Sequence, residues 1–220
     1  MTKAKTNNSN SKIPHRKKAD AVFEADKYNG YTDLLITNNL FRSFIRRSFY
    51  IRNILKFVKG KTIDFGCGVG EVLKYLPDGS LGLDPDNTSV KYCQSRNLNA
   101  KFYDIKKAKY SLEFLKNQKF ETLLMNHVLE HIDNPEKVMT KLLEESKKIN
   151  LKKIIVVVPC KIGYEADETH VQYIIKDFFE NNIKSPHYKI VHTKYYPINN
   201  RFIGNIFRYQ ELVIVYEINK

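Results

Sequence analysis

The segment TIDFGCGVGE, residues 62–71, places three glycines at alternate positions directly after an acidic residue. These residues, Gly66, Gly68 and Gly70, are three of only nine glycines in the chain. Glycine permits positive φ angles and lets a ligand come close to the backbone. An apolar run precedes the glycines, so they are expected in a loop at the carboxyl end of a strand, where α/β sheets bind ligands. The loop is expected to lead into a helix near Glu71, whose free N–H groups would face the ligand.

The spacing of the glycines argues against two common nucleotide-binding loops. In the dinucleotide pattern GxGxxG the third glycine comes one residue later, where this chain has Glu71, and the phosphate loop GxxxxGK[ST] is absent. The acid inside the preceding apolar run, Asp64, would repel a phosphate but accept an ammonium group, directly or through water. Neither NAD nor ATP is therefore indicated. Asp64 can alternatively act only by ordering the loop.

Two more acids follow the next apolar runs. Asp84, in GLDPD, lies twenty residues after Asp64 and can accept hydrogen bonds from both hydroxyls of a ribose. Asp104, in FYDI, can accept a hydrogen bond from an exocyclic amine, although it can also be a helix cap or a loop acid. The ligand outlined in this way has an amino-acid head, a ribose and an adenine, with no required phosphate. S-adenosylmethionine fits that outline.

With these motifs in this order, the chain resembles the class I S-adenosylmethionine-dependent methyltransferases of the small single-domain type, similar to methyltransferase types 11 and 12. DFGCGVG resembles their D/ExGxGxG loop, GLDPD their ribose-binding strand end, and FETLLMNHVLEHIDNPEKVM their fourth strand and the helix after it. The resemblance covers about residues 61–173. It implies an α/β, Rossmann-like sheet of seven strands, mostly parallel with an antiparallel last strand, and helices on both faces. It also implies an enzyme that transfers the sulfonium methyl group to a nucleophile.

The resemblance assigns cofactor contacts residue by residue. The glycine loop would hold the methionine part, the second strand end the ribose, the third strand end the adenine, and the fourth strand end would line the cofactor partly through backbone carbonyls. The predicted cofactor-binding residues are Asp64, Gly66, Cys67, Gly68, Gly70, Asp84, Pro85, Asp104, Ile105, Asn126 and His127. Glu130 and His131, in LEHI, are expected to begin a helix and pack locally rather than to take part in chemistry.

The methyl acceptor is predicted to lie near the segment PCKIGYEADETHVQYI, residues 159–174. In small-molecule members of the family this region carries an acid followed by THxxxF/Y, which Asp167 and the residues after it match in type. His170 is the predicted catalytic residue, because an imidazole can take a proton from a hydroxyl or an amine. Tyr164, Thr169 and Tyr173 are the predicted substrate contacts. The alternative is a packed ring beside a helix capped by Glu168 or Thr169.

The elements that position these residues alternate along the chain. Five short apolar runs, most of them predicted as buried strands, are KTIDFG, SLGLD, AKFYDI, ETLLMNH and KKIIVVVP. Helical patterns lie between them, including DNTSVKYCQSRN and NPEKVMTKLLEESKKI, in which Asn134 is the expected cap and Pro135 the first helical residue. Alternation of this kind predicts a parallel sheet with right-handed crossovers. HYKIVHTKYY and ELVIVYEI lack a helix between them and are predicted as an antiparallel pair at one edge.

The net charge of +13 is concentrated near the amino terminus. Residues 1–20 carry six Lys and Arg against one Asp, and residues 41–61 carry seven with no acid. Phe41, Phe44, Ser48, Ile51, Leu55 and Val58 recur at steps of three and four, which predicts a helix ended by Gly60. Its basic face can meet phosphates or a membrane surface, or can simply be solvated.

The expected organisation is a disordered basic tail over residues 1–20, an N-terminal helical segment over 21–60, and the methyltransferase domain over 61–220. No run of about 18 apolar residues predicts a transmembrane helix. Cys67, Cys93 and Cys160 are an odd number without a CxxC pair, which argues against a disulfide framework and a metal site and favours a cytoplasmic location.

Three functions are compatible with the sequence. The first is methyl transfer from S-adenosylmethionine to an O or N nucleophile of a small molecule, such as a sugar, a lipid precursor or another metabolite. The absence of a separate target-recognition domain favours it. The second is methylation of RNA or another macromolecule through the basic N-terminal segments. The third is an inactive cofactor-binding partner protein, which the intact glycine loop argues against.

Overall fold

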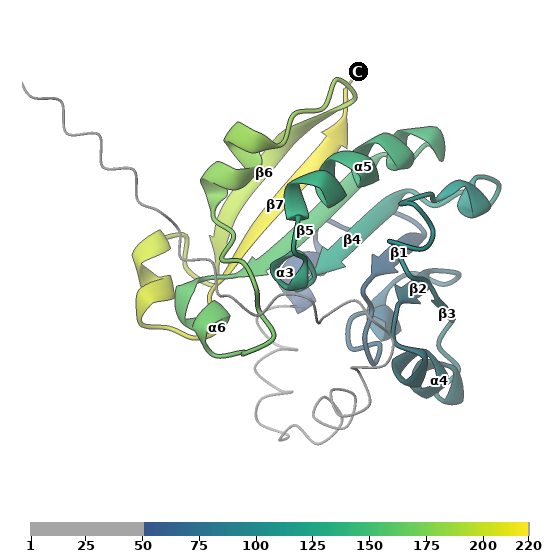
Figure 1. Ribbon diagram of the computed structural model, residues 1–220, viewed down its shortest axis with the longest axis horizontal. Helices are drawn as coiled ribbons and strands as arrows, with labels where there is room; N and C mark the ends of the chain where they lie inside the picture. Colours follow the sequence, from purple (N-terminus) through teal and green to yellow (C-terminus); the bar gives the residue numbers. More distant parts are fainter. Residues whose placement is uncertain (1–50, 220) are drawn as a thin grey trace, which may run out of the picture.

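The computed structural model describes residues 51–219, which form one seven-stranded sheet with helices around it (Figure 1). The strands are β1 (Thr62–Phe65), β2 (Leu81–Asp84), β3 (Ala100–Phe102), β4 (Thr122–Asn126), β5 (Lys153–Pro159), β6 (Tyr188–Tyr196) and β7 (Glu211–Ile218). The α-helices are α3 (Arg52–Leu55), α4 (Asn87–Ser95), α5 (Pro135–Lys148) and α6 (Lys161–Glu165). Short 3₁₀ segments are η3 (Leu73–Tyr75), η4 (Glu113–Leu115), η5 (Leu129–His131) and η7 (Arg201–Asn205), and η6 (Phe178–Asn182) is a π-helical turn.

The strand order is β3-β2-β1-β4-β5-β7-β6, and β7 alone runs antiparallel to its neighbours. The pairing of β1 with both β2 and β4 is parallel, which brings the carboxyl ends of the central strands to one edge. In Figure 1 the arrowheads of β4 and β5 point to that edge and the arrowhead of β7 points away from it. The predicted fold class is confirmed, including the antiparallel last strand.

Each face of the sheet is covered by its own apolar core. Alternate residues of one strand go to opposite cores: Leu123 and Met125 of β4 belong to one, and Leu124 between them belongs to the other. The first core also holds the buried stripe of α5, formed as predicted by Val138, Met139, Leu142 and Leu143. The second core holds Ile54 of α3 and residues of α4. In Figure 1, α5 lies in front of the sheet and α3 behind it.

Local capping explains where the two longest helices begin. The Asp86 carboxylate accepts hydrogen bonds from the N–H groups of Thr88 and Ser89, at 3.0 and 2.9 Å, and starts α4. The Asn134 side chain accepts from the Lys137 N–H at 3.1 Å, and Pro135 is the first residue of α5. Both starts agree with the sequence prediction.

Three local predictions were wrong. No α-helix follows the glycine loop; turns and η3 occupy the segment, because Pro77 forces Leu76 into an extended conformation with ψ 156°. The helix predicted to reach Gly60 ends at Leu55, and half of its predicted apolar face lies outside the described residues. No helix starts at His170, so Glu168 and Thr169 do not cap one; an irregular stretch runs there instead, and α6 precedes it.

Only part of the predicted basic face lies in the described part of the chain: Arg42, Arg46 and Arg47 precede residue 51, as do residues 1–20, whereas Arg52, Lys56, Lys59 and Lys61 follow it. Within residues 51–219, no helix has the length and apolar character needed to cross a lipid bilayer.

Candidate functional site

The glycine loop joins the carboxyl ends of β1 and β2. The Gly66 N–H donates to the Leu83 carbonyl at 2.7 Å, and the Gly68 N–H donates to Asp84 Oδ2 at 2.7 Å. All three glycines of the motif have positive φ angles, at 73°, 51° and 77° for Gly66, Gly68 and Gly70. The loop is therefore fixed to the neighbouring strand by its own backbone, in a conformation that favours glycine.

Two of these glycines are also required by packing inside the protein. A Cβ at Gly66 would lie 2.5 Å from Val128 Cγ2, and a Cβ at Gly70 would lie 2.6 Å from Leu98 Cδ1. These contacts add a reason that the sequence analysis missed, because it considered only a ligand. The Cys67 side chain points into the core beneath the loop, where its hydrogen bond with Cys93 and its burial raise the pKa of its thiol. Only the Cys67 backbone is left for a ligand contact.

Asp84 is buried at the end of β2 and ties the loop to the start of α4. Its Oδ2 accepts from the Gly68 N–H and its Oδ1 from the Asp86 N–H at 2.8 Å. Burial raises the pKa of Asp84 to about 6, and the two backbone hydrogen bonds oppose that rise. A carboxylate oxygen has more than one lone pair, so each oxygen can still accept a hydroxyl hydrogen bond. Pro85, also buried, follows directly.

The ionised form of Asp64 is strongly disfavoured by its surroundings. Its side chain is 2% exposed, and its Oδ2 has no hydrogen-bond partner among the residues that the structure describes. Burial and the nearby Asp84 raise the pKa of Asp64 to about 7, against a hydrogen bond from the Leu73 backbone. A positively charged ligand group would relieve both the burial and the repulsion.

Asp104 and Ile105 stand at the end of β3, beside Asp84. Asp104 Oδ1 accepts from the N–H groups of Lys106 and Lys107, at 3.0 and 3.1 Å, so the carboxylate caps a turn, the alternative left open by the sequence. The Tyr103 N–H donates to the Asp84 carbonyl at 2.9 Å, which holds the two strand ends together. Ile105 is 2% exposed and belongs to the core below the edge.

Asn126 and His127 end β4 next to the glycine loop. Asn126 Oδ1 is buried and has no partner among residues 51–219. His127 has a φ of 57°, and its ring lies between two acids: Nδ1 is 3.1 Å from Glu130 Oε1, and Nε2 is 2.7 Å from Glu211 Oε1. Burial alone would lower the pKa of His127, but these carboxylates raise it to about 10. His127 is therefore a cation paired with two buried acids, whose combined charge it offsets in part.

The segment predicted to meet the acceptor docks on η5. The N–H groups of Val171 and Gln172 both donate to the Glu130 carbonyl, at 2.8 and 3.2 Å. His170 is 5% exposed; its Nδ1 lies 2.8 Å from the Tyr164 carbonyl, and its ring is stacked on that of Tyr164 at a centroid distance of 5.6 Å. Because a carbonyl only accepts, Nδ1 carries the hydrogen, so in the neutral form of the ring Nε2 carries the lone pair.

The predicted substrate contacts gather around His170. Thr169 Oγ1 donates to Asp167 Oδ1 at 2.6 Å and also lies 3.1 Å from His131 Nδ1. Tyr173 packs on Tyr164 at a centroid distance of 5.3 Å, and burial raises the pKa of Tyr173 to about 12. The structure thus brings Tyr164, Thr169, His170 and Tyr173 together at the edge that carries the glycine loop.

Two acids of this site were missed or undervalued in the sequence. Glu130 was expected to pack locally, yet its side chain is 1% exposed and faces His127 and His170. Glu211 was not considered; it opposes Pro159 across the antiparallel β5–β7 pair, which places it beside His127. The only signal for Glu211 in the sequence is an acid that starts an otherwise apolar strand.

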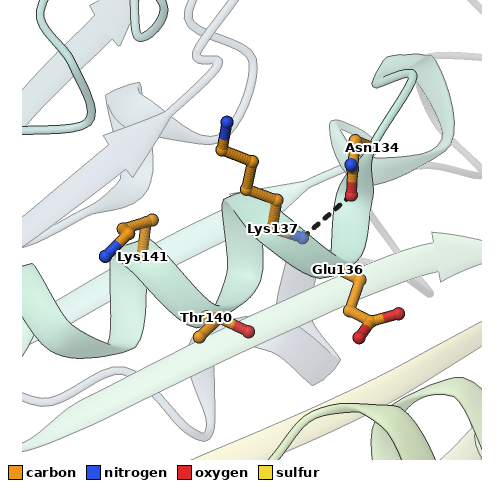
Figure 2. A pocket seen from close by; sticks show the side chains of 5 residues that line it. All are labelled: Asn134, Glu136, Lys137, Thr140 and Lys141. Atoms are coloured by element: carbon orange, nitrogen blue, oxygen red, sulfur yellow. Dashed lines mark hydrogen bonds between the residues drawn. The ribbon is translucent and has the colours of Figure 1, made fainter.

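A pocket of ≈ 360 Å³ lies on the outer side of the first turns of α5 (Figure 2). Asn134, Glu136, Lys137, Thr140 and Lys141 line it, and Figure 2 shows their side chains along the first turns of the helix. Most of them are exposed, and none belongs to the predicted site. The pocket reflects the capped start of α5 rather than the chemistry at the strand ends.

Comparison with known proteins identifies the family. A family model described as "Methyltransferase domain" matches residues 37–184. The chain belongs to this methyltransferase family. The predicted enzyme class and the predicted cofactor, S-adenosylmethionine, are confirmed. No curated protein matches the sequence.

Solved structures share the fold at low sequence identity. An S-adenosylmethionine-dependent methyltransferase from Anabaena variabilis has a TM-score of 0.64 at 16% identity, covering 94% of this chain and 100% of its own. A putative methyltransferase in complex with the Trm112 activator of Haloferax volcanii has a TM-score of 0.60 at 12% identity, over 89% and 97% of the chains. Magnesium protoporphyrin IX methyltransferase of Synechocystis PCC 6803, with bound SAH, has a TM-score of 0.57 at 15% identity, over 89% and 98%.

The residues at the strand ends fit S-adenosylmethionine. Two buried oxygens, Asp64 Oδ2 and Asn126 Oδ1, have no partner among the described residues, and both lie at the ends of adjacent strands. The cofactor carries the groups such oxygens need: an ammonium, hydroxyls and an exocyclic amine as donors, and no phosphate. The uncompensated Asp64–Asp84 pair would hold a cation better than an anion.

Proposed function

We propose that the protein transfers the methyl group of S-adenosylmethionine to an oxygen or nitrogen nucleophile of a small molecule, such as a sugar, a lipid precursor or another metabolite. The observation that carries this proposal is the arrangement of two groups on one sheet edge. An acidic pair without a cationic partner among the described residues, Asp64 and Asp84, stands beside the glycine loop at the ends of β1 and β2. The residues that follow β4 and β5, the next two strands of the sheet, bring His131 and His170 together.

The cofactor supplies an electrophilic methyl group on a sulfonium. The chain's own residues would bind and orient it: Asp64 as acceptor for the positive head, Asp84 for hydroxyls, and Asn126 for a donor group through its buried Oδ1. Asp104 and Ile105 would flank the adenine, although the cap made by Asp104 Oδ1 leaves mainly Oδ2 for that contact. Burial of this edge limits the access of water, which strengthens each of these contacts.

The acceptor would lie on the side of Tyr164, Thr169, His170 and Tyr173. Methyl transfer needs the nucleophile aligned with the methyl group, and aromatic side chains can hold a small acceptor in place. The Nε2 lone pair of His170 can take a proton from a hydroxyl or an amine. Glu130 Oε1 and Asp167 Oδ2, each 3.9 Å from Nε2, would favour the imidazolium that results.

A small acceptor is supported by one of the structural relatives, which is a magnesium protoporphyrin IX methyltransferase. RNA or another macromolecule is the second candidate, and the thirteen Lys and Arg of residues 1–20 and 41–61 are the observation in its favour. Binding to phosphates through them would weaken steeply with salt.

The test is a screen of methyl acceptors in which S-adenosylhomocysteine formation is measured, with and without added RNA. Calorimetry of S-adenosylmethionine, NAD and ATP precedes it. We expect binding of the first in the micromolar range, and turnover with at least one metabolite class. Tighter binding of NAD would overturn the cofactor assignment. Turnover with RNA alone, falling steeply between low and physiological salt, would replace the small-molecule assignment with the RNA one.

A further inference from the structure

Glu130, His131 and His170 form a compact cluster beside the cofactor edge. Each offers one ligand atom, and these atoms all lie within 4.8 Å of one another. Two of the residues come from η5 and the third from the segment that docks on it, so the cluster exists only in the folded chain. The sequence, read through its cysteines, predicted no metal site.

The orientation of His170 matches that of a metal ligand. Its Nδ1–H donates to the Tyr164 carbonyl at 2.8 Å, which fixes the tautomer and leaves the Nε2 lone pair facing Glu130 and Asp167. Metal-bound histidines commonly donate their other N–H to a carbonyl in this way. His170 Nε2 and Glu130 Oε1 lie 3.9 Å apart, which is too far for a hydrogen bond. Both atoms are acceptors when the ring is neutral, and this distance leaves room for a cation between them.

Glu130 supplies a second, independent observation. Its side chain is 1% exposed, its Oε1 contacts the His127 ring, and its Oε2 has no partner within residues 51–219. A buried carboxylate oxygen without a donor destabilises a fold, whereas coordination to a cation satisfies it. His131 is oriented by Thr169, whose Oγ1 lies 3.1 Å from His131 Nδ1 and donates to Asp167. Hydrogen-bond partners of this kind commonly hold the histidine ligands of metal ions in place.

We propose that Glu130, His131 and His170 bind a divalent transition-metal ion of the zinc and cobalt class, with Asp167 Oδ2 or water completing the coordination. Two histidines and one carboxylate are a ligand set that suits such ions. Bonds of about 2.0–2.1 Å in tetrahedral geometry place ligand atoms roughly 3.4 Å apart. On metal binding, the Glu130 and His170 ligand atoms would therefore move together by about 0.5 Å, and any other pair by about 1.4 Å at most. A metal on His170 Nε2 excludes its use as a proton acceptor, so this site and the general-base role are alternatives.

The experiment uses tag-free full-length protein, freed of metal with a chelator and then titrated with Co²⁺ alone. We expect one Co²⁺ per chain, a visible d–d absorption band, and loss of that band when Zn²⁺ displaces it. His170→Gln and Glu130→Gln each remove one ligand and should weaken Co²⁺ binding by about 100-fold or more. This exceeds the roughly 10–100-fold loss expected when a residue that only hydrogen-bonds to a ligand is substituted. His187→Gln, at an exposed histidine, is the matched control and should bind as the parent does.

Calorimetry with S-adenosylhomocysteine on each variant, in the absence of metal, shows whether the fold and cofactor site persist. Intact cofactor binding together with lost Co²⁺ binding supports the site. Thr169→Val is a milder variant for the case in which a ligand substitution prevents folding, and about 10–100-fold weaker binding is expected for it. Absence of a Co²⁺ band in the parent protein, or equal Co²⁺ binding by parent and His170→Gln, would overturn the metal site while leaving the methyltransferase assignment untouched.

Discussion

Asp64→Asn should make the protein more stable and its cofactor binding weaker. The buried Asp64 carboxyl has a pKa of about 7 in place of 3.8, because it is desolvated and close to Asp84. Each pKa unit corresponds to about 1.36 kcal/mol, so ionising this group destabilises the folded protein by about 4 kcal/mol at most. The amide of Asn lacks that charge but leaves a donor unpaired, and a net gain of about 1–3 kcal/mol at pH 8 is expected.

The effect has a defined pH dependence. Between pH 4 and pH 7 the folded state holds more protons on Asp64 than the unfolded state does, so the free energy of unfolding falls as pH rises through that window. Relative to Asp64→Asn, the parent protein should lose about 2–3 kcal/mol of stability between pH 5 and pH 7, and the difference should level off above pH 7.

Chemical denaturation at pH 5, 6, 7 and 8 measures this difference, and calorimetry with S-adenosylmethionine gives the second half of the prediction. Loss of the ionic acceptor should weaken cofactor binding by about 1.5–3 kcal/mol, roughly 10–150-fold. Asp78→Asn, on an exposed turn, is the control and should change neither quantity. If Asp64→Asn is instead destabilised to the same extent at every pH, Asp64 serves to order the loop, the alternative that the sequence left open.

Three other predictions concern the same edge. Asp84→Ala should weaken cofactor binding by about 1.5–3 kcal/mol in calorimetry, and an unchanged affinity would mean that the ribose is held elsewhere. Glu211→Gln should lower the free energy of unfolding by about 3 kcal/mol, the lower end for a broken buried ion pair, while Glu217→Gln on the exposed end of β7 should stay within about 0.5 kcal/mol; equal effects would show that the contact with His127 is unimportant. His170→Ala should reduce turnover by about 10²–10⁴-fold with little change in cofactor affinity, and full activity on the true acceptor would remove His170 from the mechanism.

The features that the sequence predicted well depend on short-range patterns. The runs around Ile63, Leu83 and Leu123 are apolar over a few residues and end in polar ones, which is sufficient to define a buried strand and its carboxyl end. Asp86 and Asn134 cap helices through contacts within three residues. Once the strand ends are known, parallel pairing alone brings Asp64, Asp84 and Asn126 to one edge.

The features that the sequence did not predict depend on contacts between distant segments. Glu211 lies next to His127 only because β7 inserts antiparallel beside β5, and nothing in the local pattern of either residue indicates that register. The docking of Val171 on the Glu130 carbonyl likewise joins segments with no pairing signal. The helix expected after Gly70 failed for a local reason instead, since too few residues separate the loop from Pro77.

The charges along this edge are arranged in two different ways, and the difference indicates what each half binds. On the β4 and β7 side, the cation His127 lies between Glu130 and Glu211, so the protein itself neutralises much of the buried charge. On the β1 and β2 side, the described residues place no cation within ion-pair distance of Asp64 or Asp84, and burial together with their mutual repulsion raises the pKa of Asp64. A phosphate would increase that repulsion, whereas a cationic ligand would supply the missing charge. The free energy that ionisation of Asp64 beside Asp84 costs the folded protein would therefore favour a positively charged, phosphate-free cofactor.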